Sequence, residues 1–224
     1  MQTLGRTLHG ALGALLLLGC GGREDSPPTS GPKGKPKEEG TRILETSSQT
    51  LQSFEPVRAI DTYLDGFHTL YNDSGHVMEA HLFCRARNEE FTQCVMFDAN
   101  TADANMVGIK YIVSERLYQS LPADEKLLWH ALDYEVLSGQ LVAAGLPDVA
   151  EHAFMQKKLH AYAKTWRTWD VGAPNSKSLP LGQAALGWSL SADGQLPEAM
   201  LRERDKRMNI DTAQKREARK DLAP

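Results

Sequence analysis

The stretch between residues 21 and 40 most limits where this chain can fold, because it contains only glycine, proline, serine, threonine and charged residues. A segment without an apolar side chain to bury cannot build a core, so it predicts a solvated tether. With residues 41–50 added as a transition, we expect residues 20–50 to be disordered, with a root-mean-square span of about 30 Å. The folded domain is then expected in residues 51–224.

The first nineteen residues predict a signal peptide. Arg6 precedes an apolar run over residues 10–19, which is the order of charge and hydrophobicity found in secretory leaders. A helix that spans a bilayer needs about 20 apolar residues, so this run is too short for a retained transmembrane anchor. We therefore expect residues 1–19 to be cleaved from the mature protein.

The end of the apolar run, Leu-Leu-Gly-Cys at residues 17–20, resembles the bacterial lipobox. That resemblance implies that Cys20 becomes the acylated first residue of a lipoprotein and that the acyl chains anchor it in a membrane. Gly21, rather than aspartate, follows the cysteine, which implies the outer membrane of a bacterial cell envelope. The leaflet stays open, and an ordinary secretory signal that happens to end in cysteine is the alternative.

The charge distribution argues against nucleic acid as a partner. The whole chain has a net charge of −4, and residues 41–197 carry 12 Lys and Arg against 19 Asp and Glu, a net charge of −7. An acidic domain repels the phosphate backbone, because non-specific nucleic-acid binding depends on basic side chains.

Apolar periodicity predicts a single α+β domain in which helices cover a mostly antiparallel sheet. Helices are predicted for residues 55–66 and 147–166, the latter from an apolar stripe at residues 155, 159, 162 and 166. Strands are predicted for residues 77–85, 91–98, 107–113 and 183–190, and a hairpin for residues 134–142. Residues 196–208 and 211–222 read as polar C-terminal helices. No strand–helix–strand rhythm is visible, which favours α+β over α/β.

Several motifs occur in the same order as in a known family: Gly66-Phe67-His68, Met78-Glu79-Ala80-His81, Asn88-Glu89-Glu90-Phe91, Asn100-Thr101-Ala102-Asp103-Ala104 and Trp129-His130. Over about residues 57–208 the chain resembles the plant oil body-associated protein family, which has bacterial and fungal members. The resemblance implies association with lipid droplets and brings no catalytic residues.

Two of these motifs depart from the plant pattern. Plant members tend to show His-His-Tyr-Cys where this chain has His81-Leu82-Phe83-Cys84, and Trp-His-Ser-His where it has Trp129-His130-Ala131-Leu132. A metal site built on the second histidine of either motif would be incomplete here.

The histidines are nevertheless the candidate metal ligands, because zinc and iron sites are commonly built from histidine and carboxylate groups. His81, His130 and His152 are expected to face the core, with Glu135 or Glu79 as a fourth group. The alternative is that these histidines are interior side chains satisfied by hydrogen bonds.

Cys84 and Cys94 lie in the two arms of a predicted hairpin. Export would permit a disulfide between them, and two buried free thiols are the alternative.

Two function classes follow from these patterns. The first is a non-enzymatic envelope lipoprotein whose domain binds an apolar ligand or a protein partner, with no cofactor. The second is a metal-dependent envelope enzyme that uses the histidine cluster with zinc or iron. The nucleophile elbow, the Walker loop and the dinucleotide-binding glycine motif do not occur in the sequence, so nothing favours the common acyl-transfer or nucleotide chemistries.

Overall fold

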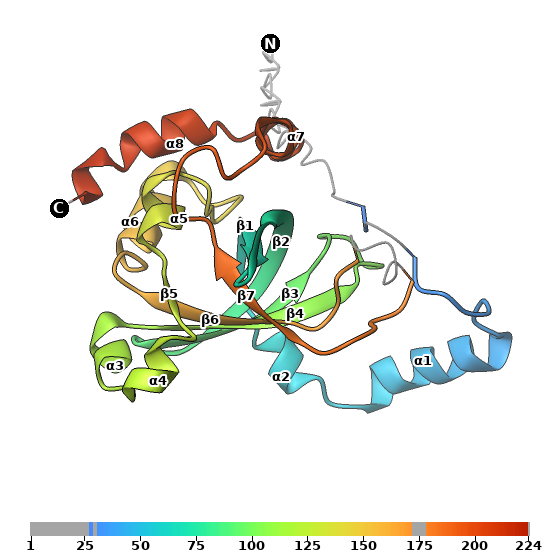
Figure 1. Cartoon of the computed structure of the whole chain (residues 1–224). Helices are drawn as coiled ribbons and strands as arrows, with labels where there is room; N and C mark the ends of the chain where they lie inside the picture. Colours follow the sequence, from blue (N-terminus) through green and yellow to red (C-terminus); the bar gives the residue numbers. More distant parts are fainter. Residues whose placement is uncertain (1–26, 29–30, 172–177, 224) are drawn as a thin grey trace, which may run out of the picture.

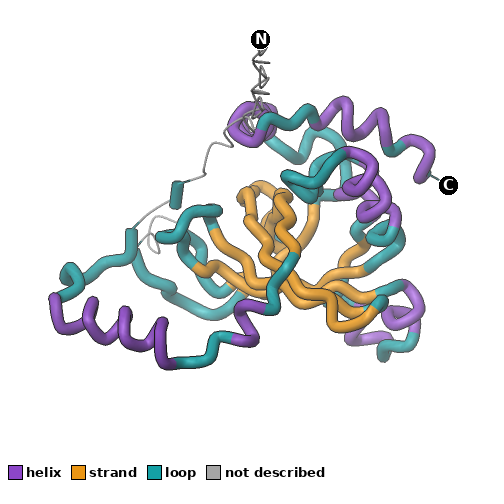
Figure 2. Tube along the Cα trace, turned by 180° about the vertical axis from the view of Figure 1, so that it is seen from behind, coloured by secondary structure: helices purple, strands orange, loops and turns teal. Residues whose placement is uncertain are grey.

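The computed structural model describes residues 27–28, 31–171 and 178–223. The predicted signal peptide and the predicted lipidation site Cys20 lie outside these residues. At the centre is an antiparallel sheet with helices around it (Figures 1 and 2). The strands are β1 (Thr62–Leu70), β2 (Asp73–Asn88), β3 (Phe91–Phe97), β4 (Met106–Val113), β5 (His130–Ala131), β6 (Tyr162–Arg167) and β7 (Ala185–Ser189).

The helices fall into three groups around this sheet (Figure 1). Two lie at the N-terminal side, two short ones follow β4, and the remaining four gather at one end of the sheet. They are α1 (Glu39–Leu51), α2 (Glu55–Arg58), α3 (Glu115–Gln119), α4 (Ala123–Lys126), α5 (Asp133–Leu137), α6 (Asp148–Gln156), α7 (Glu198–Met208) and α8 (Thr212–Ala218), followed by a 3₁₀ turn, η1 (Lys220–Leu222). Among the residues described, no helix has both the length and the apolar content to cross a membrane.

The sheet closes on itself, which corrects the predicted open sheet covered by helices. The strand order is β4-β3-β2-β1-β7-β6-β5, and β4 also pairs with β6. Six strands therefore form a closed antiparallel barrel, so the α+β class holds while the layered arrangement does not. Closure pairs both edges of β4, and paired edges expose no free backbone groups to other chains.

Two glycines permit the close approaches at this closure. A Cβ atom on Gly108 of β4 would lie 2.3 Å from the carbonyl oxygen of Trp166 on β6. A Cβ atom on Gly187 of β7 would lie 2.8 Å from Cγ2 of Thr165. Any other residue at these two positions would push β6 away from its neighbours.

Side chains that point into the barrel form most of its core, because successive residues of a strand face opposite sides of the sheet. Along β2, the even-numbered residues Met78, Ala80, Leu82 and Cys84 belong to the buried core cluster. The odd-numbered residues, from Glu79 onward, face the outside of the barrel wall. This division separates the polar groups described below into an interior and an exterior set.

Three segments differ from the predicted secondary structure. The helix predicted for residues 55–66 ends at Arg58, and from Thr62 the chain is β1, paired with β2 and β7. The helix predicted for residues 147–166 ends at Gln156, the backbone turns at His160 with a φ of 61°, and β6 follows. The hairpin predicted for residues 134–142 begins as helix α5.

The last part of the predicted tether is also helical. Helix α1 covers Glu39–Leu51, inside the segment predicted to be disordered, and none of its residues is buried. Hydrogen bonds from Thr46, Ser47 and Thr50 to carbonyl oxygens four residues earlier accompany this helix. The segment is therefore regular in structure, although it contributes nothing to the core, since its large apolar side chains Ile43, Leu44 and Leu51 are all exposed.

Cys84 and Cys94 form a disulfide between β2 and β3. Their sulfur atoms are 2.00 Å apart, and the two residues are direct cross-strand partners. The bond lies inside the barrel, next to the position that Lys110 of β4 takes opposite Cys94.

A buried arginine fastens the C-terminal end to the rest of the domain. Arg219 follows α8 and is 1% exposed. Its Nη1 donates to the carbonyl oxygens of Val136 at 2.6 Å and Leu141 at 3.0 Å, and its Nη2 donates to Glu151 Oε1 at 3.0 Å. Val136 belongs to α5 and Leu141 to the segment that follows it, so Arg219 ties the C-terminal segment to this part of the domain.

We predict that Arg219→Met lowers the free energy of unfolding by about 3 kcal/mol, because it leaves Glu151 and two buried carbonyl oxygens without this donor. The loss stays at the lower end of the usual range because Lys215 still contacts Glu151 at 2.7 Å. Lys220→Met is the matched control, since Lys220 is exposed and pairs only with Glu217; it should change stability by less than about 0.5 kcal/mol. Urea denaturation measures both, and equal effects would contradict the prediction.

Candidate functional site

An apolar groove lies on the outer face of the barrel wall, where α2 approaches β2 and β3. Phe83, Val95 and Phe97 point outward from these strands, and Val57 and Ile60 come from α2 and the turn after it. The groove has a volume of about 480 Å³. Its other lining residues, from the segment between β3 and β4, are Ala99, Thr101, Ala102, Ala104 and Met106.

The carboxylate of Asp98 helps to hold the segment between β3 and β4 in place. Asp98 accepts hydrogen bonds from the backbone N–H of Asn105 at 2.8 Å and from its amide nitrogen at 2.9 Å. These bonds close a short loop, and the small residues inside it leave space above the strands. The groove is therefore part of the fixed backbone rather than a gap between flexible side chains.

One end of the groove is positively charged. A second cavity, of about 270 Å³, shares Ile60, Phe83 and Val95 with the first and is also lined by Arg85 and Arg87. Neither guanidinium makes an ion pair with any described residue. The neighbouring acidic residues are engaged elsewhere, since Glu89 pairs with Lys157 at 3.8 Å and Glu90 pairs with Arg116. An apolar channel with unpaired cations at one end matches the shape and charge of an anionic amphiphile.

The four predicted metal ligands do not converge, which corrects the predicted cluster. His81 lies on the outer face of β2, whereas His130 on β5 is 3.7 Å from Glu135. His152 lies on the surface face of α6, where its Nε2 is 3.0 Å from Asp221. The structure therefore brings together two separate pairs: His130 with Glu135, and His81 with the alternative fourth group Glu79, each pair 3.7 Å apart. Strand alternation places His81 and the other two groups on opposite faces of the wall.

The barrel interior contains a polar cluster that the sequence analysis did not find. Lys110 is fully buried, and its Nζ is 2.8 Å from Nε2 of His68 and 3.3 Å from Oε2 of Glu135. An ammonium group thus occupies the position between histidine and carboxylate that a metal ion would need. The sequence feature that could have predicted this cluster is Lys110 itself, the one lysine on the inward face of an otherwise apolar strand.

Burial dominates the electrostatics of this interior cluster. It lowers the pKa of Lys110 and raises the pKa of Glu135, while the attraction between the two groups opposes both changes. Burial also lowers the pKa of His68 and of His130 well below the usual histidine value, and the nearby Lys110 adds to this effect. For His68, His130 and Arg167 contribute in the same direction. The two imidazoles are therefore held neutral.

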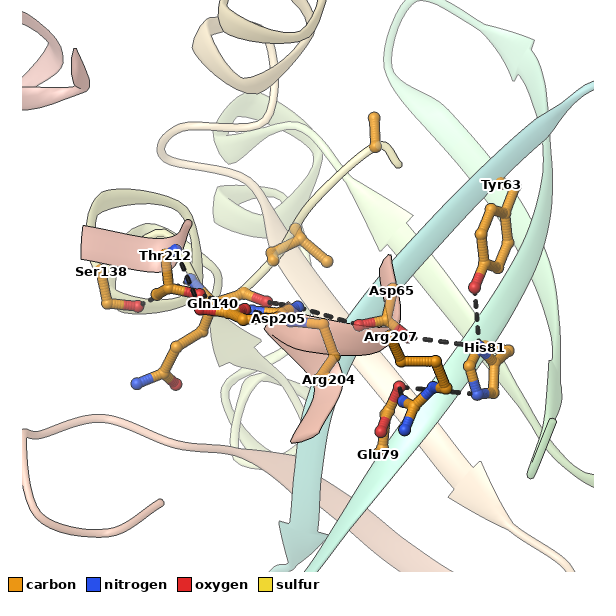
Figure 3. Close-up of polar contacts among 12 residues, drawn as sticks. Tyr63, Asp65, Glu79, His81, Ser138, Gln140, Arg204, Asp205, Arg207 and Thr212 are labelled. Carbon is orange, nitrogen blue, oxygen red and sulfur yellow. Dashed lines mark hydrogen bonds and ion pairs between the residues drawn. The ribbon is translucent and has the colours of Figure 1, made fainter. Parts of the chain in front are cut away.

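A third group of side chains surrounds Asp65 on the outer wall, beneath α7 (Figure 3). Nδ1 of His81 is 2.7 Å from the Tyr63 hydroxyl and 3.2 Å from Oδ2 of Asp65. Nε2 of His81 is 3.7 Å from Oε1 of Glu79. Single ligand atoms from Asp65, Glu79 and His81 all lie within 4.8 Å of one another, so these three residues could hold a metal ion.

Two arginines of α7 contact this group from outside the wall. Arg204 Nη1 donates to Asp65 Oδ1 at 2.9 Å, and Arg207 donates to Glu79. Burial raises the pKa of Asp65 well above its usual value, with a further contribution from the Glu79 carboxylate, and Arg204 opposes both. Of this group, His81 and Glu79 were among the predicted metal ligands, whereas Asp65 was not.

Known proteins are similar to this chain over most of its folded part. A family model described as "Protein of unknown function (DUF1264)" matches residues 54–223. The chain is 36% identical to Oil body-associated protein 1B of Arabidopsis thaliana over 196 residues, which is 87% of this chain and 80% of that protein. It is 38% identical to Oil body-associated protein 1A of Zea mays over 186 residues, 83% of this chain and 77% of that protein. No solved structure matches.

We predict that stability falls as the pH drops below about 6.5, because the unfolded chain then takes up protons that His68 and His130 in the fold do not. Below that pH each histidine lowers the free energy of unfolding by up to about 1.4 kcal/mol per pH unit, and above it neither histidine reduces stability. His130→Gln should therefore flatten the decline between about pH 6.5 and 5, as measured by urea denaturation across the range.

Burial raises the pKa of Glu135, so its protonation at low pH favours the folded state, whereas protonation of the histidines favours the unfolded state. Because Glu135 is present in every variant, the prediction is tested by the difference between the pH profile of the variant and that of the parent protein. Thr165→Val is the matched control, since it alters the same barrel interior without removing an imidazole. Parallel profiles for His130→Gln and the parent protein would contradict the prediction.

Proposed function

We propose that this chain, which belongs to the oil body-associated protein family, is a lipid-anchored binding protein of the bacterial cell envelope. Its barrel would hold an anionic amphiphile of the fatty-acid type in the apolar groove. The observation that carries this proposal is the groove itself, which combines apolar walls with two unpaired arginines at one end.

The size and lining of the groove support a small ligand. A volume of about 480 Å³ lies within the range of roughly 300–1,000 Å³ that is typical of ligand pockets. Val57 and Met106, which both line the groove, are 66% and 58% exposed, so the groove presents large apolar side chains to water. An acyl chain that covers them would remove this apolar surface from water.

The charge at the end of the groove supports an anionic head group over a neutral one. Residues 41–197 have a net charge of −7, so the field of the domain as a whole repels anions. Arg85 and Arg87 are a local exception on the same outward face of β2 as Phe83. A carboxylate bound by a guanidinium gains a charge-assisted hydrogen bond, which is stronger than a neutral one.

The names of the plant relatives support contact with lipid. They are called oil body-associated proteins, which places those proteins at a lipid store. Anchoring through acylated Cys20 would hold this chain at a membrane, and its location in the outer membrane rests on the lipobox resemblance and on Gly21. A groove for free fatty acids and an acyl anchor are compatible, because the tether separates them along the chain.

The groove is tested by displacement of a fluorescent fatty acid from the full-length protein with oleate or with uncharged oleyl alcohol. We predict that the double variant Arg85→Ala/Arg87→Ala weakens oleate binding about tenfold, equivalent to about 1.4 kcal/mol, and affects the alcohol much less. Val57→Asp should weaken both ligands, because it places a charge at the apolar edge.

Arg58→Ala is the matched control, since Arg58 lies on the same helix as Val57 but pairs with Glu55 and does not line the groove. It should bind both ligands like the parent protein. If oleate causes no saturable displacement, or if it binds the arginine variant as tightly as the parent, the groove is not a fatty-acid site, and a protein partner becomes the remaining explanation.

The anchor is tested separately with Cys20→Ala. We expect the mature parent protein to begin at a lipid-modified Cys20 by mass spectrometry and to enter the detergent phase on phase separation, because several acyl chains bind a bilayer firmly. Cys20→Ala should lack the lipid mass and stay in the aqueous phase, whereas the Arg58→Ala control should behave like the parent. A mature parent protein that begins at another residue and stays in buffer would refute lipidation.

A further inference from the structure

We propose that Asp65, Glu79 and His81 form a binding site for a divalent transition-metal ion such as Zn²⁺ on the outer wall of the barrel. The proposal differs from the metal cluster predicted from the sequence, because it keeps His81 and the alternative fourth ligand Glu79 but has Asp65 in place of His130 and His152. It also lies apart from the groove residues, so it does not depend on the proposed ligand.

The backbone fixes the three side chains relative to one another. Asp65 of β1 and His81 of β2 are direct cross-strand partners, and Glu79 lies two residues before His81 on the same face of β2. Such neighbours on one face of an antiparallel pair are within reach of each other. Their ligand atoms lie within 4.8 Å of one another without any distortion of the sheet.

One oxygen of Asp65 is directed into the site without a hydrogen-bond donor. Arg204 occupies Oδ1, whereas Oδ2 faces His81 and accepts no hydrogen bond from the described residues, although Asp65 is 0% exposed. A fully buried carboxylate oxygen that accepts no hydrogen bond is costly, because burial removes its hydration. A cation bound at Oδ2 would remove that cost.

The surrounding groups resemble the outer shell of a metal site. Ligating carboxylates are usually hydrogen-bonded by a second layer of residues that fixes their orientation. Arg204 does this for Asp65, and Arg207 does it for Glu79 (Figure 3). The hydroxyl of Tyr63, 2.7 Å from Nδ1 of His81, fixes the orientation of the imidazole ring.

The charge balance leaves room for a cation. Asp65 and Glu79, with Asp205 beside Arg204, supply three negative charges, while Arg204 and Arg207 supply two positive ones. With a neutral imidazole the group keeps an excess negative charge in a largely buried position. Mixed carboxylate and imidazole ligands suit zinc and iron, whereas magnesium and calcium prefer oxygen ligands alone.

The site is accessible from one side. The side chains of Asp65 and His81 are fully buried, whereas those of Glu79 and Arg207 are 17% and 18% exposed. An ion can therefore reach the ligands from the surface when the guanidinium of Arg207 moves aside. The buried lysine distinguishes the interior cluster from this site, because Lys110 already supplies the cation there.

The test uses the full-length protein in detergent, stripped with a chelator and dialysed against buffered Zn²⁺, with bound metal measured by elemental mass spectrometry. We expect one Zn²⁺ per chain. Glu79→Gln should lower the Zn²⁺ affinity at least tenfold while keeping the fold, because Glu79 is partly exposed and glutamine preserves its shape. Asp65→Asn is a second variant, in which Zn²⁺ should no longer raise the melting temperature.

Two control variants separate this site from other metal binding. Glu90→Gln removes another glutamate that pairs with an arginine, and His152→Gln removes a surface histidine beside an aspartate; both should bind Zn²⁺ like the parent protein. If less than stoichiometric Zn²⁺ remains on the parent, or if Glu79→Gln keeps the parent affinity, the group is only a buried ion-pair network and the proposal is wrong.

Discussion

Closure of the barrel through the pairing of β4 with β6 is the constraint on which the rest of the structure depends. It gives the wall an inside and an outside, and strand alternation then sends neighbouring residues to different environments. Lys110 can be buried because its strand faces Glu135 across the interior, and the groove can exist because the opposite face of the same wall carries apolar side chains. The absence of a side chain at Gly108 lets β6 approach closely enough for this pairing.

Buried arginines are the second feature that organises the domain. They come from α7 and from the segment after α8. Arg204 and Arg219 are 0% and 1% exposed, and each reaches past its own helix to acidic groups or carbonyl oxygens of the barrel domain. A buried arginine is tolerable only when its donors are used, so these contacts fix where the C-terminal helices lie. The C-terminal helices therefore close the domain through polar anchors in addition to the apolar packing of α7 against Phe67.

The sequence predicts local patterns well and contacts between distant segments poorly. Alternating apolar residues predicted β2, β3 and β4, and the helix predicted from residue 211 begins there, where the side chain of Asp211 caps α8. The stripe at residues 155–166 was misread because a spacing of four residues fits one face of a helix and one face of a strand equally well. Residues 162 and 166 in fact share a face of β6. The metal prediction failed for the same reason: convergence of His81, His130 and His152 depends on which face each segment presents, and closure decides that.

Strand β2 connects the core, the Asp65 site and the groove, because one sixteen-residue strand contributes to all three. Its even-numbered residues enter the core, Glu79 and His81 lie beneath α7, and Phe83 with Arg85 begins the groove further along the same outer face. A slip of one residue would exchange the two faces and destroy all three arrangements at once. The disulfide between Cys84 and Cys94 joins β2 to β3 at the point where the interior residues meet Lys110, so it fixes the β2–β3 register on which the groove relies.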